Sequence, residues 1–279
     1  MPTATPDLSA APSAALPPPP LPAVDARWAL CLDVDGTLLD FLDDPLAVRA
    51  EEPLRALLHA LHRRLDGALA LVSGRGLDDL DRIFGAPHWP AAGLHGLQLR
   101  HADGHRREIT TTPAQQAHLC AMAQQLAARF AGVTWEDKYT GVALHCRRAP
   151  AQFAPLQAAA RALLPQLPGY ELQPGNLVLE FKPAGMDKGK ALHELLDTAP
   201  FAGRLPVYLG DDLTDEHAFA GINQRQGLSV RVGAREPTVA RFTLPGPAAA
   251  EAWLVRVLDA LTHGAPIHDP IPGGQQRQP

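Results

Sequence analysis

Short apolar runs alternate with helix-like segments along most of this chain, and this alternation constrains its fold more than any other feature. Residues 28–34, 68–72 and 91–95 form brief, nearly continuous apolar runs. Such runs suit strands that are buried on both faces of a parallel sheet. Between them, apolar residues recur at helical spacing over 48–65 and 77–84. Strands separated by helices imply right-handed crossovers and predict an open α/β sheet.

The middle of the chain has a different pattern. From about residue 97, two strand-like segments flank Ala102-Asp103-Gly104, which is a good hairpin turn. Two repeats follow, each made of a helix and a strand pair. The predicted helices are 113–130 and 152–164, and the predicted strand pairs are 133–138 with 141–147 and 170–173 with 177–182. This order predicts an antiparallel sheet with helices on one face, so residues 97–182 are interpreted as an inserted α+β domain.

The α/β pattern returns at Lys188. It predicts helices over 188–197, 214–220 and 248–261 and strands over 205–209 and 228–232. We therefore predict a Rossmann-like, parallel-sheet core of residues 27–96 and 183–263. Residues 1–26 contain eight of the 28 prolines and residues 264–279 contain four. Proline-rich segments without apolar periodicity form no core, so 1–26 is expected to be disordered and unpacked and 264–279 a flexible tail.

Composition excludes several classes of protein. The chain has 279 residues, 46% of them apolar and 20% charged, with a net charge of −5. This composition is typical of a packed domain and gives no basic surface for nucleic acid. No stretch approaches the ~18 apolar residues that a membrane span needs. The three cysteines lack metal-like spacing, and prolines interrupt the start of the chain, which has no Lys or Arg before Arg27. A reduced, cytoplasmic protein without a secretory signal is expected.

Four polar motifs carry the candidate chemistry, and ligands of open parallel sheets bind where the strands end. The first is Asp33-Val34-Asp35-Gly36-Thr37, whose two carboxylates at i and i+2 can face one side. Two such charges require a compensating cation or proton. The fourth, Gly210–Glu216, has four carboxylates in six residues, a plausible Mg²⁺ site. An acidic turn and an acidic helix start capped by Thr214 are the respective alternatives.

The second and third motifs offer groups that bind anions. Ser73-Gly74-Arg75 follows a strand, so a hydroxyl, backbone N–H groups and a guanidinium could cradle a phosphate. A helix N-cap at Ser73 is the alternative. In the third motif, which opens a helix, Lys188 could neutralise a carboxylate and a phosphoryl oxygen. A solvated lysine–glycine turn is the alternative there.

As an ordered set, these motifs resemble those of the haloacid-dehalogenase-like phosphotransferases and, within them, the trehalose-6-phosphate phosphatase family. The resemblance covers nearly all of residues 27–263, and it rests on Asp33–Leu39, Val72–Arg75, Lys188-Gly189 and Gly210–Glu216. The inserted domain is similar to the superfamily's C2-type cap. The resemblance implies a Mg²⁺-dependent phosphatase of trehalose biosynthesis that converts trehalose 6-phosphate to trehalose and phosphate.

The resemblance also implies roles for individual residues. Asp33 would attack phosphorus and form an aspartyl-phosphate, and Asp35 would act as general acid and then as general base. Mg²⁺ would be held by the Asp33 carboxylate, the Asp35 carbonyl and Asp211. Phosphoryl oxygens would be held by Lys188 together with Ser73, Gly74 and Arg75. Asp212 and Asp215 are both candidates for water-mediated or supporting contacts to the ion, and the sequence does not rank them.

Substrate choice would come from the inserted domain. Glu136 and Lys138 stand at i and i+2 on one predicted strand and Glu180 on another. They match the family's Glu-x-Lys and later Glu, which resemble a sugar-binding trio. A solvated face of the sheet is the alternative. His145 and Arg147 fit the family's His-x-Arg stretch, although Cys146 replaces the usual aromatic residue and is expected to be a packed small side chain.

His95 lies at a presumed hinge. A structural histidine is the favoured interpretation, and a role in the cleft between core and cap is the alternative. The cap is expected to open and close on two linkers, near Gly96 and near 183–185.

Other functions remain possible at this point. A phosphatase of the same superfamily that acts on sucrose phosphate or mannosylglycerate phosphate is the nearest rival, although those enzymes more often carry Asn in the last acidic motif. A catalytically silent sugar-phosphate sensor is the rival from another class, and it would usually have lost an acidic residue of the site. The oligomeric state is not predicted.

Overall fold

An eight-stranded, mostly parallel sheet forms the core of the larger domain in the computed structural model, which describes residues 16–41, 47–85, 87–138, 140–175 and 177–264. The strand order is β12-β11-β10-β1-β2-β3-β4-β5. These strands are β1 (Trp28–Leu32), β2 (Leu69–Val72), β3 (Ala91–Gly93), β4 (Gln98–Arg100), β5 (Arg106–Glu108), β10 (Leu205–Gly210), β11 (Leu228–Val232) and β12 (Phe242–Leu244). Every residue of β1 and β2 is buried, as expected for central strands of a parallel sheet.

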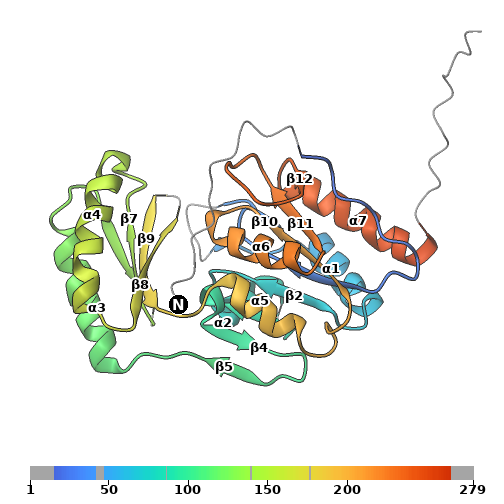
Figure 1. Ribbon diagram of the computed structural model, residues 1–279, viewed down its shortest axis with the longest axis horizontal. Coiled ribbons are helices and arrows are strands. Elements are labelled where there is room, and N and C mark those ends of the chain that lie inside the picture. The colour runs from blue at the N-terminus through green and yellow to red at the C-terminus, as the bar shows by residue number, and fades with distance from the viewer. Residues whose placement is uncertain (1–15, 42–46, 86, 139, 176, 265–279) are drawn as a thin grey trace, which may run out of the picture.

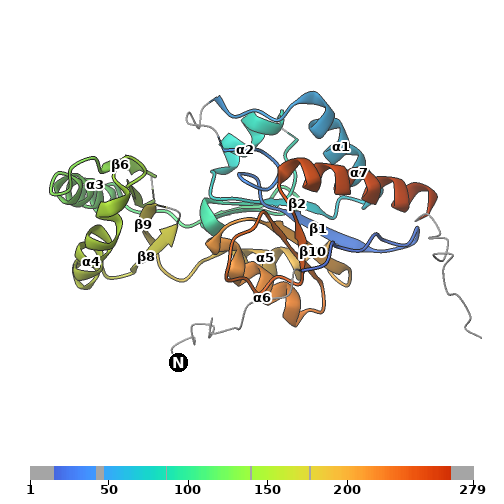
Figure 2. The same ribbon diagram turned by 90° about the horizontal axis from the view of Figure 1, so that it is seen from above.

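Helices cover both faces of this sheet. Figure 2 shows α1 (Glu52–Arg64), α2 (Leu77–Phe84) and α7 (Pro247–His263) on one face and α5 (Lys188–Leu196) and α6 (Glu216–Gln224) on the other. In α1, a proline stands in the first turn, basic residues occupy the last turn, and the buried leucines recur at helical spacing. The α/β class predicted for the core is confirmed.

The inserted domain is a separate antiparallel sheet backed by two helices (Figure 1). Its strand order is β6-β7-β9-β8, with β6 (Thr134–Asp137), β7 (Val142–His145), β8 (Tyr170–Gly175) and β9 (Val178–Pro183). The helices are α3 (Pro113–Ala127) and α4 (Phe153–Leu163). Val142, Leu144, Leu179 and Phe181 pack with helix residues in a second hydrophobic core, which also contains Cys146. The opposite face of this sheet is therefore free to turn toward the larger domain.

The hairpin that follows residue 97 was assigned to the inserted domain, and this assignment is wrong. β4 pairs antiparallel with β3, and β5 pairs with β4, so both strands extend the core sheet. The hinge predicted near Gly96 is wrong for the same reason, because the chain leaves the core only after β5. Gly96 packs against α5 instead, where an added Cβ would lie 2.8 Å from the Asp187 carbonyl oxygen.

A buried ion pair holds the hairpin to α2. Arg100 donates from both terminal nitrogens to the Asp81 carboxylate at 2.7 Å each, and its Nε donates to the Trp89 carbonyl at 2.8 Å. We expect Arg100→Ala to lower the free energy of unfolding by ~3–5 kcal/mol, because it removes the two 2.7 Å bonds to the buried Asp81 carboxylate and leaves it only His88 at 3.2 Å and Arg106 at 3.7 Å. Arg106→Ala, whose side chain is 48% exposed, is the control and should cost under ~1 kcal/mol. Chemical denaturation measures both; equal losses would contradict the prediction.

The described part of the N-terminal segment is packed, contrary to expectation. Leu16, Leu21 and Ala26 pack against the core, and the Pro17 carbonyl accepts a hydrogen bond from the Thr243 N–H of β12 at 3.0 Å. Proline lacks a donor but keeps its carbonyl acceptor, so a proline-rich chain can still bind a strand edge. Residues 1–15 and 265–279 lie outside the described residues.

None of the helices in the described ranges is long and apolar enough to cross a membrane.

Candidate active site

Three of the four motifs meet because their strands are neighbours in the sheet. β1 lies between β2 and β10. Asp33 directly follows β1 and donates its N–H to the Leu209 carbonyl of β10 at 3.0 Å. Ser73 directly follows β2, and Asp211 directly follows β10. The carboxyl ends of three adjacent parallel strands therefore bring these side chains to one edge of the sheet.

Lys188 brings the remaining motif to the same point. It is the first residue of α5, a helix capped by the Asp187 side chain, which accepts the Lys190 N–H at 2.8 Å. The Lys188 ammonium donates to Asp33 Oδ1 and to Asp215 Oδ1, both at 2.7 Å. Burial disfavours its charge, but the carboxylates of Asp215 and Asp33 outweigh burial and raise the pKa of Lys188. Lys188 is thus a buried cation held between two acids.

Asp215 and Asp212 differ in burial and in their hydrogen bonds. Asp215 is fully buried; its Oδ1 also accepts from the Tyr208 hydroxyl at 2.6 Å, and its Oδ2 accepts the N–H groups of Asp211 and Asp212 at 3.1 and 3.0 Å. Two contacts to each oxygen use the lone pairs of this carboxylate. Asp215 therefore orients the loop and Lys188. The Asp212 side chain is 30% exposed and lies 3.5 Å from Arg235 Nε.

The acidic groups at this edge are suited to a divalent cation. One carboxylate oxygen from each of Asp33, Asp211 and Asp215 lies within 4.8 Å of the others. Burial, first of all, and the neighbouring carboxylates raise the pKa of Asp33 to about 7, against the lowering effect of Lys188, and that of Asp211 to about 9. Three carboxylates face one ammonium, and Mg²⁺ prefers a few such oxygens with water and phosphate. Since Asp215 is fully hydrogen-bonded, Asp33 and Asp211 are the acids that fit such an ion.

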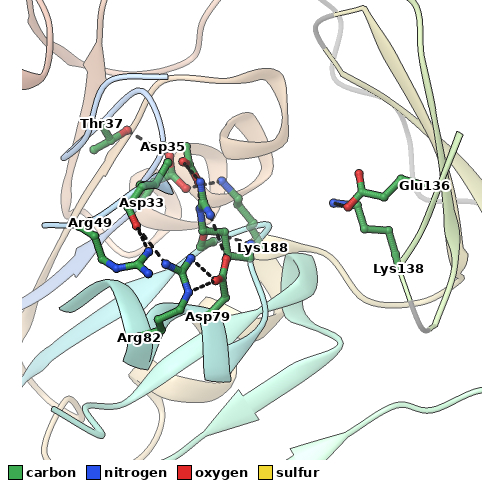
Figure 3. A network of polar contacts seen from close by, with 12 residues as sticks. Asp33, Asp35, Thr37, Arg49, Asp79, Arg82, Glu136, Lys138 and Lys188 are labelled. Carbon is green, nitrogen blue, oxygen red and sulfur yellow. Dashed lines mark hydrogen bonds and ion pairs between the residues drawn. The ribbon is translucent and has the colours of Figure 1, made fainter. Parts of the chain in front are cut away.

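Asp35 belongs to a second network at the same edge (Figure 3). Arg75 donates from Nε and Nη2 to the two Asp35 oxygens at 2.7 Å each, and from Nη1 to Asp79 at 2.9 Å. Asp79 also accepts from Arg82 Nε at 2.9 Å. The structure thus places Arg75 on the Asp35 carboxylate, and its contact with phosphate stays a prediction. The paired guanidinium fixes the orientation of the Asp35 carboxylate.

Ser73 and Thr37 supply hydroxyl groups beside the acids. Ser73 is buried, and its Oγ accepts the Arg75 N–H at 3.1 Å, which leaves its own proton available to a ligand. Thr37 donates to Asp33 Oδ2 at 3.1 Å. Thr37 belongs to the first sequence motif, but nothing in the sequence indicated that it would fix the Asp33 carboxylate.

On the inserted domain, the predicted sugar-binding acids share one row of the sheet. Glu136 of β6 stands opposite Ala143 of β7, which stands opposite Glu180 of β9. Directly opposed residues project to the same face, so both acids lie on one side with a small side chain between them. Figure 3 shows Glu136 and Lys138 projecting toward the core residues around Lys188. The two halves of the predicted site therefore face each other.

Glu136 is the centre of a charged cluster. It lies 3.0 Å from Lys138 Nζ through Oε1 and 2.9 Å from His145 Nε2 through Oε2. The hydrogen bond from His145 first, and then the charge of Lys138, overcome the effect of burial and lower the pKa of Glu136 to about 2. Glu180 lies farther along the row and contacts the core, with its Oε2 3.4 Å from His95 Nε2. Glu136 remains an acceptor at any physiological pH.

Several residues of the site were not predicted. Tyr208 lies inside a buried strand, Asp79 and Arg82 stand at helical spacing on α2, and each acts through a residue named above. Only their placement relative to other strands reveals their role. Helical i, i+3 spacing of Asp79 and Arg82 is common on solvated helices and carried no specific signal.

The fold and the acidic edge together define a class of protein. A parallel α/β core with acids at its strand ends and a separate α+β domain is the arrangement of haloacid-dehalogenase-like hydrolases. One such hydrolase structure, from Bacteroides thetaiotaomicron, has a TM-score of 0.60 over 84% of this chain and all of its own, at 13% identity. The predicted fold is confirmed.

Sequence comparison narrows the class to a family. Residues 31–248 match the trehalose-phosphatase family, and the chain belongs to it. The chain is 43% identical to a probable trehalose-phosphate phosphatase of Sinorhizobium fredii over 76% of its length and 80% of the relative's. It is 35% identical to the trehalose-6-phosphate phosphatase of Escherichia coli over 86% and 90%. The C-terminal domain of the Candida albicans trehalose-6-phosphate phosphatase shares the fold, with a TM-score of 0.73, 84% and 93% coverage and 21% identity. The predicted family is confirmed.

Proposed function

We propose that this enzyme hydrolyses trehalose 6-phosphate to trehalose and phosphate, with Mg²⁺ as cofactor. Family membership supports the activity, and one observation carries the mechanism. Asp33 is a buried carboxylate that lies beside Asp211 and is fixed by hydrogen bonds from Lys188 and Thr37. The face of the inserted domain that carries Glu136 and Glu180 is turned toward this edge of the core sheet. A nucleophile, a charge-neutralising group and a set of hydroxyl-binding acids therefore face one another.

In the proposed reaction, Asp33 attacks phosphorus, the bond from phosphorus to the sugar oxygen breaks, and Asp35 gives its proton to that oxygen. Asp35 then takes a proton from the water that hydrolyses the aspartyl-phosphate. Arg75, bound to both Asp35 oxygens, holds this carboxylate in position. Lys188 and the Ser73 hydroxyl would hold phosphoryl oxygens. Asp33 and Asp211, with the Asp35 carbonyl, would hold Mg²⁺, which supplies positive charge against the phosphate when bound.

Phosphate release from a panel of sugar phosphates tests the function. Trehalose 6-phosphate should give the highest kcat/KM, ahead of sucrose phosphate, mannosylglycerate phosphate and glucose 6-phosphate, and activity should require Mg²⁺. Asp33→Asn is the control for contaminating phosphatases. Preference for another sugar phosphate would leave the fold and the chemistry standing but overturn the substrate. Binding without turnover under all metal conditions would instead favour a silent sensor.

Metal binding can be measured without turnover. Adding Mg²⁺ to metal-free enzyme should raise the melting temperature, because an ion that binds only the folded state at 100 times its Kd adds about 2.7 kcal/mol. Asp211→Asn should abolish most of this shift by removing one of the two available acids. Asp78→Asn is the matched control, since its side chain is 95% exposed. An undiminished shift in Asp211→Asn would place the ion elsewhere.

We also infer a reduced, cytoplasmic environment. Cys31, Cys120 and Cys146 are all free thiols, and Cys31 and Cys146 are buried in the two hydrophobic cores. Unpaired, buried cysteines behave as small apolar side chains and are typical of reducing compartments.

A further inference from the structure

A histidine of the core reaches into the inserted domain. His95 Nε2 lies 3.4 Å from Glu180 Oε2, and the two side chains are 17% and 16% exposed. Glu180 stands in the row of residues that turns toward the core. His95 belongs to the short turn between β3 and β4, so this contact crosses from one domain to the other.

The backbone at His95 is held in an unfavourable conformation. Leu94 and His95 have φ values of 49° and 53°, in the left-handed region that side chains other than glycine rarely adopt. The Leu94 N–H donates to the Arg75 carbonyl at 2.9 Å, and the His95 N–H donates to the Ser73 carbonyl at 3.1 Å. Two consecutive residues of this kind persist only where their surroundings fix them, and such sites cluster at functional centres. Here the fixing partner is the proposed phosphate-binding loop.

The imidazole also packs on that loop. A Cβ added to Gly74 would lie 2.8 Å from both Cε1 and Nε2 of His95. The absence of a side chain at position 74 therefore makes room for the ring. The motif Ser73-Gly74-Arg75 therefore requires glycine at position 74, which its sequence alone did not reveal.

The contacts around the ring favour one tautomer. His95 Nδ1 is buried and has no hydrogen-bond partner among the described residues. A buried N–H without a partner costs more than a bare acceptor nitrogen that lacks one, so we place the proton on Nε2, where it is donated to Glu180. Glu180 Oε2 is then occupied by His95, and Oε1 stays available for a second donor.

We propose that His95 is a positioning residue for substrate selection. It fixes the position of the Glu180 carboxylate relative to the phosphate-binding loop, so that the sugar and the phosphate of one substrate must fit both at once. This proposal rests on the proposed function. Burial acts against the charge of Glu180, but the contact with His95, followed by the charges of Lys138 and Lys182, lowers the pKa of Glu180. Glu180 is therefore an ionised, oriented acceptor. A substrate without the sugar gains nothing from this arrangement.

Kinetics with two substrates test the proposal. Trehalose 6-phosphate needs the sugar contact, and p-nitrophenyl phosphate does not. We expect His95→Ala to lower kcat/KM for trehalose 6-phosphate about tenfold or more, mainly through KM, and to lower it far less for p-nitrophenyl phosphate. His95→Gln, whose side-chain amide can replace the Nε2–H donor, should recover much of the loss. His118→Ala is the matched control, because that histidine is exposed on α3.

A double-mutant cycle completes the experiment. If His95 acts through Glu180, His95→Ala adds little to the loss caused by Glu180→Ala alone. Equal losses for both substrates, or fully additive losses in the double variant, would overturn the proposal and show that His95 only supports the phosphate-binding loop. Failure of the proposed function is separately visible, because the unaltered enzyme would then show no preference for trehalose 6-phosphate over the other sugar phosphates.

Discussion

Replacing Lys188 by methionine should both abolish activity and destabilise the fold. Lys188 is 3% exposed and donates to two carboxylates, Asp33 and Asp215, that are themselves buried. Without the ammonium, these acids keep their burial and lose their counter-charge, which typically costs ~3–5 kcal/mol. For a chain of this size that corresponds to a fall of roughly 10 °C in melting temperature. Differential scanning fluorimetry without added metal measures the effect.

A lysine two residues farther along the same helix provides the control. Lys190 is 54% exposed and donates to the Gly185 carbonyl at 2.9 Å. Lys190→Met should change the melting temperature by little and preserve phosphate release. If Lys188→Met melted like Lys190→Met, the acids would have to be protonated or neutralised by another group, and the charge balance proposed for the site would be wrong.

Asp33→Asn should have the opposite effect on stability while also removing activity. Loss of the nucleophile should lower kcat by roughly 10⁴-fold or more. The metal-free fold should become more stable, by roughly 1 kcal/mol or more, because one of three clustered carboxylates is neutralised while Lys188 keeps Asp215 as partner. The sign of this stability change follows from the pKa of Asp33. Folding raises that pKa to about 7, so the ionised carboxylate opposes folding at neutral pH.

The melting temperatures of Lys188→Met and Asp33→Asn at pH 7 should therefore differ, although both variants are inactive. Added Mg²⁺ should raise the melting temperature of the unaltered enzyme above that of Asp33→Asn, since this variant lacks one of the two acids that would hold the ion. A metal-free Asp33→Asn protein that melts below the unaltered one would show that the Asp33 hydrogen bonds from Lys188 and Thr37 outweigh the repulsion.

Much of the architecture was predictable because local patterns determine it. Apolar runs before Asp33, Ser73 and Asp211 identified strands whose ends carry chemistry, and the helix periodicity between them implied crossovers that place those ends together. The helix-and-hairpin repeats likewise identified the inserted sheet. In each case the signal was local in the sequence.

What could not be predicted depends on contacts between distant segments. The turn at Ala102–Gly104 identifies a hairpin but not the sheet that accepts it, which the Arg100–Asp81 pair decides. Asp212 and Asp215 are equivalent in sequence, and the burial of Asp215 and its contacts with Tyr208, Lys188 and two backbone N–H groups distinguish them. Arg75 follows a phosphate-loop pattern yet binds Asp35, because the two loops come from neighbouring strands.

The packing of the N-terminal segment has a practical consequence. β12 and β5 form the two borders of the core sheet, and β5 is entirely charged (Arg106, Arg107 and Glu108). Charge discourages another strand from adding there. At β12 the segment through Pro17 occupies the Thr243 donor instead. A shortened polypeptide that began at Arg27, chosen because prolines look dispensable, would uncover that donor and offer a template for self-association between molecules.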